Sequence, residues 1–396
     1  MQYSTFAAID IGSYDVILEI FEISKKQGIR SVDKICHRME LGKDTYTLGK
    51  IRPEMEEELC RVLADFVRIM EGYRVDDYRA TASSAISEAS NSLYVLGKIH
   101  QLTGLSVTVL SNSEQRFLSY KALAAMEDNF NKIIEKGTAI LDLDGGSFQI
   151  SLFDKDALVT TQNIRMGSLR IRERLAGIQS ETEHYEEMVE ELIWNEVSSF
   201  KKMYLKDRKI ENIMLIGDVF TDSVYQNIEE KTTKIISREN FNTWYEKIIR
   251  QSPMELAVKL GIPLENASLM YPSAVIYKCL IDMMGAEHIW IPGVHMTRGI
   301  AYEYAEQMKL LKGGHNFEND ILMAAKNIGK RYAVNRPHVQ NLEMTALAMF
   351  DATKKMHGMK ERERLLLQMA VMLHDVGKYI SFNNVADSSY NIIMSN

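Results

Sequence analysis

Cysteines and long apolar runs are both scarce in this chain of 396 residues. Its three cysteines, Cys36, Cys60 and Cys279, lie far apart and lack the spacing of a disulfide framework or of a metal-binding motif. We therefore expect a reducing, cytoplasmic environment. The N-terminal "MQYSTFAAIDIGS" has neither a basic region nor an uninterrupted apolar segment, and no transmembrane stretch is visible. Neither an export signal nor a membrane partner is expected.

Positive charge is also limited, because the net charge is −7. This balance argues against a general nucleic-acid binder and requires any polyanionic ligand to meet a local concentration of basic residues. One such concentration is "RMGSLRIRERL", in which Arg165 is the candidate phosphate-binding residue. Ligand-facing and solvent-facing roles for this segment remain open. The 46% hydrophobic and 26% charged residues are typical of a globular protein, and the length predicts two or three domains.

Two similar stretches, "AAIDIGSYDVILEI" and "AILDLDGGSFQISL", each predict a strand, a tight turn and a second strand. The small residues of the two turns are candidate phosphate-binding residues, because they let backbone amides approach an anion: Gly12 and Ser13, then Gly145, Gly146 and Ser147. Each first strand ends in an aspartate, Asp10 or Asp142, which suits a magnesium ion or its waters. Two ordinary hairpins are the alternative interpretation, but the repetition favours a shared ligand site.

The order of the expected elements indicates two related halves followed by helices. Each half opens with one of the hairpins and continues with helices and strands, and the second half closes with the turn "MTRGIAYEYAEQM". After the expected linker Gly313-Gly314, only helical patterns remain. The predicted fold class is α/β, with two duplicated lobes, residues 1–124 and 125–312, and a cleft between them. An all-helical domain at residues 315–396 is expected to follow.

The ordered motifs resemble those of exopolyphosphatases and guanosine pentaphosphate phosphohydrolases. The segments that carry the resemblance are the two hairpins, "ASSAISEASN", "LSNSEQRFLSY", "RMGSLRIRERL", "LMYPSAVIY" and "MTRGIAYEYA". The resemblance implies two actin-like (ribonuclease-H-like) lobes and, from "HVQNLEMTALAMFD" and "LLLQMAVMLHDVGKYI", an HD-type helical domain. It also implies magnesium-assisted release of terminal phosphate from polyphosphate or guanosine pentaphosphate (pppGpp). Because family members usually continue beyond this point, we expect the helical domain to be truncated.

Several functional positions of that family carry other residues here. The family pattern "SGxEEARL" is similar to "SNSEQRFL", which keeps a glutamate at Glu114 but has Gln115 where the base that activates water usually lies. A family glutamate after the second hairpin corresponds to Gln149, and a family arginine corresponds to Ser87. An amide orients water but does not accept its proton, and loss of a general base costs about 100- to 10,000-fold in rate. Glu114, in a shifted register, is the candidate substitute.

The hairpin turns have gained negative charge relative to the family patterns, at Asp15 and Asp144. Two like unit charges about 4 Å apart repel by about 1 kcal/mol in water and about 4 kcal/mol near a protein surface. These carboxylates therefore oppose phosphate binding unless magnesium bridges the charges, or unless they have become metal ligands themselves.

The helical region contains candidate ligands for a metal ion in the HD-type pattern: His338, His374 and Asp375. A structural or helix-capping role is the alternative interpretation for them. The segment "NNVADSSYNII" lacks the histidines expected after "ISF". A working HD phosphohydrolase is therefore not expected.

Two interpretations of function remain. In the first, the protein is a weak or impaired phosphoanhydride hydrolase acting on polyphosphate or pppGpp. In the second, it is a non-catalytic regulator that binds polyphosphate, guanosine penta- or tetraphosphate, or a protein partner, and signals by lobe closure. A homodimer is left open.

Overall fold

The computed structural model describes residues 3–126, 130–155, 157–176, 185–217, 219–227, 235–311, 315 and 317–395. The chain divides into unit 1, residues 1–150 and 163–314, and unit 2, residues 151–162 and 315–396. The linker expected at Gly313 and Gly314 lies outside the described residues. The lobe boundaries expected at residues 124 and 312 stay predictions.

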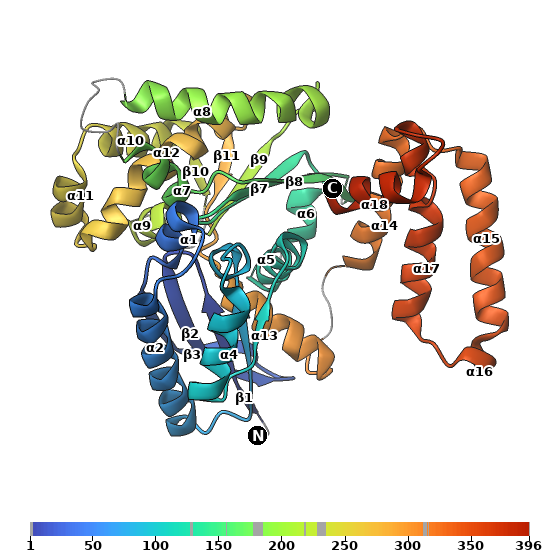
Figure 1. The fold of residues 1–396 in the computed structure, drawn as a ribbon. Helices are drawn as coiled ribbons and strands as arrows, with labels where there is room; N and C mark the ends of the chain where they lie inside the picture. The colour runs from blue at the N-terminus through green and yellow to red at the C-terminus, as the bar shows by residue number, and fades with distance from the viewer. Residues whose placement is uncertain are drawn as a thin grey trace. The chain divides into compact units, whose positions relative to one another are not determined.

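Two mixed β-sheets form the framework (Figure 1). The first has the order β3-β2-β1-β4-β5, with β1 Ser4–Ile11, β2 Asp15–Ser24, β3 Gly28–Arg38, β4 Asp77–Ala82 and β5 Val107–Val109. The second has the order β10-β11-β9-β6-β7-β8, with β6 Thr138–Leu143, β7 Phe148–Asp154, β8 Ala157–Ile164, β9 Asn212–Ile216, β10 Ile235–Ser237 and β11 His288–Trp290. Strand β1 pairs parallel to β4, and β6 pairs parallel to β9. The order β8-β7-β6-β9-β11 thus repeats that of the first sheet, and the predicted duplicated α/β fold is confirmed.

Helices cover both sheets of unit 1. Their bounds are α1 Leu41–Leu48, α2 Pro53–Gly72, α3 Ser84–Ser87, α4 Ser92–Thr103, α5 Asn112–Met126, α6 Phe130–Ile134, α7 Ser168–Leu175, α8 Tyr185–Phe200, α9 Val219–Asn227, α10 Arg238–Ile249, α11 Pro253–Leu260, α12 Leu264–Met284 and α13 Met296–Gln307. Helix α2 shows why the sequence folds this way. Pro53 occupies the start of the helix, and Leu59, Leu63, Phe66 and Met70 form its buried stripe. This stripe packs into the apolar core of the first sheet.

Helix α13 corrects one expectation, since its segment was predicted to be a closing turn. It is instead a helix whose Ile300, Ala301 and Tyr304 pack with β1 residues in one apolar cluster. Gly299 lies so close to α5 that a Cβ atom there would overlap the Leu118 carbonyl. Glycine is therefore required by helix packing at this position.

Unit 2 is helical apart from residues 151–162, which contribute to strands β7 and β8. Its helices are α14 Phe317–Arg331, α15 Arg336–Ala352, α16 Lys354–His357, α17 Glu361–Leu373 and α18 Val385–Ser395, and a 3₁₀ turn covers Val376–Tyr379. Val339, Met372 and Val376 belong to its small apolar core. Asn335 caps α15 by accepting a hydrogen bond from the backbone N–H of His338 at 3.2 Å. Within the described residues, no helix is long and apolar enough to span a membrane.

Candidate functional site

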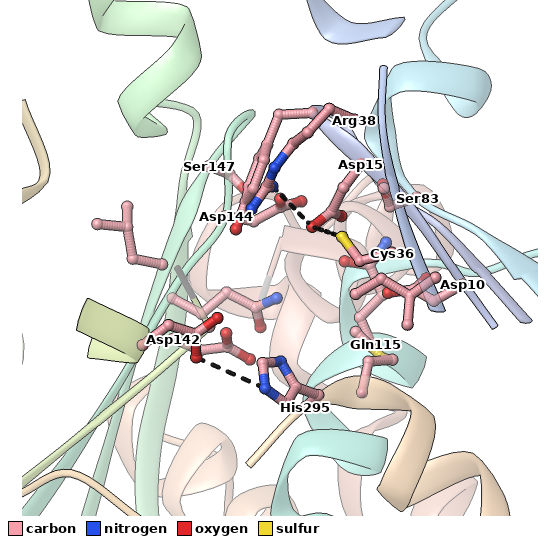
Figure 2. Close-up of a pocket in the computed structure, with 18 of the residues that line it drawn as sticks. Asp10, Asp15, Cys36, Arg38, Ser83, Gln115, Asp142, Asp144, Ser147 and His295 are labelled. Atoms are coloured by element: carbon pink, nitrogen blue, oxygen red, sulfur yellow. Dashed lines mark hydrogen bonds and ion pairs between the residues drawn. The ribbon is translucent and has the colours of Figure 1, made fainter. Parts of the chain in front are cut away.

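An acidic cavity of about 200 Å³ is lined by residues from both sheets of unit 1 (Figure 2). Its aspartates are Asp10, Asp15, Asp142, Asp144 and Asp222. Lys34 and Arg38 also border it, so the wall is predominantly anionic. A cavity of this charge favours a cation, or an anion that arrives together with a cation.

The strand duplication brings Asp10 and Asp142 to this cavity. Each is the last residue but one of its strand, Asp10 in β1 and Asp142 in β6. In the parallel ladders, Asp10 lies opposite Thr81 of β4 and Asp142 opposite Ile216 of β9. The carboxyl ends of parallel strands are where ligands bind in α/β sheets. Asp10 and Asp142 therefore border the same cavity.

Burial raises the pKa of three of these carboxyl groups toward neutrality. Asp10 reaches about 8, because burial is reinforced by the nearby charges of Asp15 and Asp144. Asp144 reaches about 7 and Asp142 about 6, again chiefly through burial. Ser119 limits the rise at Asp142 by donating a hydrogen bond to Oδ2 at 2.6 Å. At neutral pH the cavity thus retains carboxyl protons, which binding of a divalent cation would release.

Asp15, the first residue of β2, is the centre of a small polar network. Its Oδ2 lies 3.1 Å from Arg38 Nη1 and 3.6 Å from Cys36 Sγ. Burial raises the pKa of Asp15 despite the neighbouring Arg38 charge. Burial and Asp15 also raise the pKa of the Cys36 thiol to about 11, so this cysteine is not a thiolate nucleophile at neutral pH.

Gln115 and Gln149 both border the cavity and are buried. Gln149 Oε1 has no hydrogen-bond partner among the described residues. A buried acceptor of this kind needs a donor, which a bound water or a hydrated cation supplies. Together with the aspartates, it makes an oxygen-rich set that fits magnesium.

Two predicted site residues have other placements. Glu114 is exposed at the start of α5, where Oε2 accepts hydrogen bonds from Ser111 N and Oγ, both at 2.8 Å. This is a helix-capping arrangement, which does not support Glu114 as a base. Arg165 is exposed beyond the end of β8, away from the cavity wall.

The hairpin turns use part of their hydrogen-bonding capacity internally. The Gly12 N–H donates to the Asp15 carbonyl at 2.8 Å, and the Gly145 N–H donates to Asp144 Oδ1 at 2.6 Å. Gly12 and Ser147 still border the cavity. The phosphate cradle expected from the sequence therefore has fewer free amides than predicted.

The remaining predicted turn residues, Ser13, Gly145 and Gly146, lie where the two hairpins meet. Tyr46 Oη is 2.8 Å from both Ser13 Oγ and Ser84 Oγ. A Cβ atom on Gly146 would overlap Tyr46 Oη and Ser84 Oγ, and one on Gly145 would lie 3.1 Å from the Ser13 Cβ. Tyr46 thus fills the space between the turns.

Two arginines of α7 link the sheets across this contact. Arg170 stacks over Tyr46, with Cζ 3.8 Å from the ring centroid, and pairs with Glu88 at 3.0 Å. Arg172 contacts both carboxylate oxygens of Glu40, at 2.7 and 2.9 Å. The basic segment that was considered for ligand binding therefore binds protein carboxylates at these two positions. We call Tyr46, Arg170 and Arg172 the inter-lobe clamp.

The three candidate metal ligands of unit 2 are brought together. The ligand atoms of His338, His374 and Asp375 all lie within 4.8 Å of one another. His374 Nδ1 contacts the Val371 carbonyl at 2.7 Å, which leaves Nε2 directed to the group. Lys378 Nζ lies 2.7 Å from Asp375 Oδ2 and competes with a cation for this carboxylate. Two imidazoles and a carboxylate are donors that suit a first-row divalent metal.

Sequence reasoning missed Cys36, Arg38 and His295 at the cavity. The first two alternate along β3 with Lys34, and a strand presents every second residue to the same face. This alternation in the sequence could have identified Cys36 and Arg38 as residues of one strand face. His295 precedes α13 and lies 3.5 Å from Asp222 Oδ1, and burial lowers its pKa. No local pattern identifies this position, because its neighbours come from other parts of the chain.

Two sheets of equivalent strand order around one cavity define an actin-like α/β protein with a helical C-terminal region. Residues 20–308 match the model of the Ppx/GppA phosphatase family, and residues 322–396 match Ppx/GppA phosphatase, domain III. The chain belongs to the Ppx/GppA phosphatase family.

Relatives and solved structures agree with this assignment. The chain is 19% identical to a guanosine-5'-triphosphate,3'-diphosphate pyrophosphatase of Vibrio atlanticus, over 97% of this chain and 75% of the relative. It is 21% identical to a bifunctional 3-dehydroquinate synthase/phosphatase of Fusobacterium nucleatum, over 72% of this chain but only 44% of that protein.

Two crystal structures show the same fold. An exopolyphosphatase from Cytophaga hutchinsonii matches with a TM-score of 0.68 and 17% identity, over 77% of this chain and 98% of that one. The Aquifex aeolicus Ppx/GppA member matches with a TM-score of 0.63 and 17% identity, over 78% of this chain and 99% of that one.

Proposed function

We propose that this protein is a slow phosphoanhydride hydrolase that releases the terminal phosphate of pppGpp or polyphosphate in the acidic cavity of unit 1. The observation that carries the proposal is the set of buried carboxyl groups with pKa values of about 6 to 8 around that cavity. A general base works best when its pKa lies near the working pH. Relatives named for pppGpp and polyphosphate hydrolysis supply the substrate class.

Magnesium, held by Asp10 and Asp142, would supply charge neutralisation for the phosphates. Phosphoryl transfer depends mainly on positioning and charge compensation, with one group to orient and deprotonate water. Gln115 orients the water but, as an amide, does not accept its proton. Asp144 accepts the proton instead and acts as the base. The water oxygen bonds to the terminal phosphorus, and the bond from phosphorus to the bridging oxygen breaks. Inorganic phosphate and the shortened substrate leave.

Of the two substrates, pppGpp has the better support. A second cavity of about 500 Å³ in unit 1 shares Tyr14 and Arg38 with the acidic one. Met39, Met55 and Leu269 give it apolar walls, which suit a nucleoside better than a phosphate chain. A long polyphosphate would instead need a continuous basic track.

The test is phosphate release from pppGpp and from long-chain polyphosphate with magnesium, using highly purified protein. Asp144→Asn should lower the rate by about 100- to 10,000-fold, and Gln115→Glu should raise it. The matched control is Asp65→Asn on the exposed face of α2. Release that survives in Asp144→Asn would reject Asp144 as the base.

A binding regulator is the second candidate, and the inter-lobe clamp favours it. Arg170 and Arg172 use their guanidinium groups to hold the sheets together rather than to face a ligand. In a regulator, nucleotide binding would release these contacts without turnover. Binding of pppGpp by the unmodified protein without phosphate release would select this candidate over the hydrolase.

A further inference from the structure

A separate cavity of about 380 Å³ lies in unit 2, between α14 and the first turns of α15. Its volume falls in the range of small-molecule sites. Ala325, Val339 and Met372 are buried and form an apolar floor, and Val334 adds a half-buried apolar wall. The cavity therefore offers space and apolar surface for an organic ligand.

Three cations line this cavity: Lys326, Lys330 and Arg336. All three are exposed, and none has an ion-pair partner within the described part of the chain. Arg331, the next residue along α14, behaves differently, since its Nη2 donates to Thr160 Oγ1 at 3.0 Å. The cavity thus brings together three cations that have no ion-pair partner among the described residues.

Two features of the local electrostatics act against this group of cations in the absence of a ligand, although the dipole of α14 favours Lys330 in its last turn. Lys326 and Lys330 are four residues apart on α14, where like charges repel on one helix face. Arg336 is the first residue of α15, where the positive end of the helix dipole opposes a cation. A bound polyanion offsets both costs.

Glu343 distinguishes the expected ligand from a bare phosphate chain. Its carboxylate borders the same cavity, where Oε1 accepts a hydrogen bond from Gln368 Nε2 at 2.7 Å. A carboxylate at this point repels additional phosphates but accepts hydrogen bonds from ribose hydroxyls. The occupant therefore needs an anionic end, hydroxyl groups and an apolar or aromatic body.

We propose that this cavity binds a nucleoside di- or polyphosphate, with the phosphates at Lys326, Lys330 and Arg336, the ribose at Glu343, and the base against Val339. The proposal is independent of the hydrolase assigned to unit 1. It gives the helical unit a ligand site of its own.

The experiment is calorimetric titration of the full chain with GDP in EDTA, because the chelator suppresses magnesium-dependent binding in unit 1. We expect a single binding event. The double variant Lys326→Ala/Lys330→Ala should weaken it by about a hundredfold or more, since each lost charge-assisted hydrogen bond is worth about one factor of ten or more. Lys355→Ala, an exposed lysine of α16 outside the cavity, is the matched control.

A second measurement uses the unmodified protein and does not depend on the folding of a variant. GDP should bind more tightly than 2′,3′-dideoxy-GDP and more tightly than inorganic tripolyphosphate. The proposal is overturned if GDP does not bind in EDTA, if the double variant binds it as the unmodified protein does, or if tripolyphosphate binds as tightly as GDP. Phosphate release in magnesium tests unit 1 separately, so failure of one proposal leaves the other standing.

Discussion

Asp10 makes the stability of unit 1 depend on pH in a way that one substitution isolates. Its pKa is about 8 in the folded protein, while an unfolded aspartate has a pKa near its ordinary value of 3.8. Between these values the folded state holds a proton that the unfolded state has lost. The contribution of Asp10 to the free energy of unfolding is therefore fully present below about pH 4 and is lost as pH rises toward 8. Asp10→Asn removes this titration.

The magnitude follows from proton counting. One proton held by the folded state alone changes the free energy of unfolding by about 1.4 kcal/mol per pH unit. From pH 5 to pH 7, Asp10 alone should destabilise unit 1 by about 3 kcal/mol, because both pH values lie between its unfolded and folded pKa. Asp144, with a pKa of about 7, adds to the fall across this interval, and Asp142, with a pKa of about 6, adds to it mainly in the lower part.

The assay is urea unfolding in EDTA at pH 5, 6 and 7, followed by tryptophan fluorescence. All three tryptophans, Trp194, Trp244 and Trp290, belong to unit 1, so the signal reports that unit and not the helical one. Asp10→Asn should reduce the pH slope by about one proton, and the exposed Asp65→Asn should leave it unchanged. An unchanged slope in Asp10→Asn would refute the assignment of a raised pKa to this carboxyl group.

Three further substitutions test other parts of the structure. Gly146→Ala should destabilise unit 1 by about 1–3 kcal/mol in urea unfolding, because its Cβ would overlap Tyr46; a neutral result would contradict this packing. Arg172→Ala should cost about 1–3 kcal/mol, since Glu40 keeps a largely buried charge, and Arg172→Lys should restore little of it because lysine lacks the paired contacts. His374→Ala should abolish binding of Zn²⁺ or Mn²⁺ by unit 2 in equilibrium dialysis, whereas retained binding would exclude the His338 cluster as the site.

The duplicated α/β fold was predictable because its signals are local and repeated, whereas the strand order itself was not predicted. Each hairpin carries an apolar run, a small-residue turn and an alternating strand, and the strand order repeats in the two sheets. Helix α13 was missed because its apolar stripe is interrupted by Gly299, which acts as a turn signal in sequence but as a packing residue in the structure. Tertiary contact with α5 decides its conformation.

The candidate site was predictable only in part. Asp10 and Asp142 follow from strand ends, and Gln115 and Gln149 from a family pattern, and all four border the cavity. Glu114 could not be judged from sequence, because a glutamate three residues after Ser111 serves equally as a helix cap and as a base. The direction of Arg170 was equally hidden, since its partners Tyr46 and Glu88 are distant in the chain.

The charge changes in the cavity are consistent with one another. Gln115 and Gln149 are neutral amides, while Asp15 and Asp144 add carboxyl groups to the hairpin turns. Burial then raises the pKa of Asp15 and brings those of Asp142 and Asp144 to about 6 and about 7, where protons exchange near neutral pH. A phosphate entering alone would meet this negative wall, whereas a magnesium ion entering first would displace protons and offset the negative charge. Under the proposed mechanism the site would require the metal before or with the substrate, and its affinity for the pair should rise with pH.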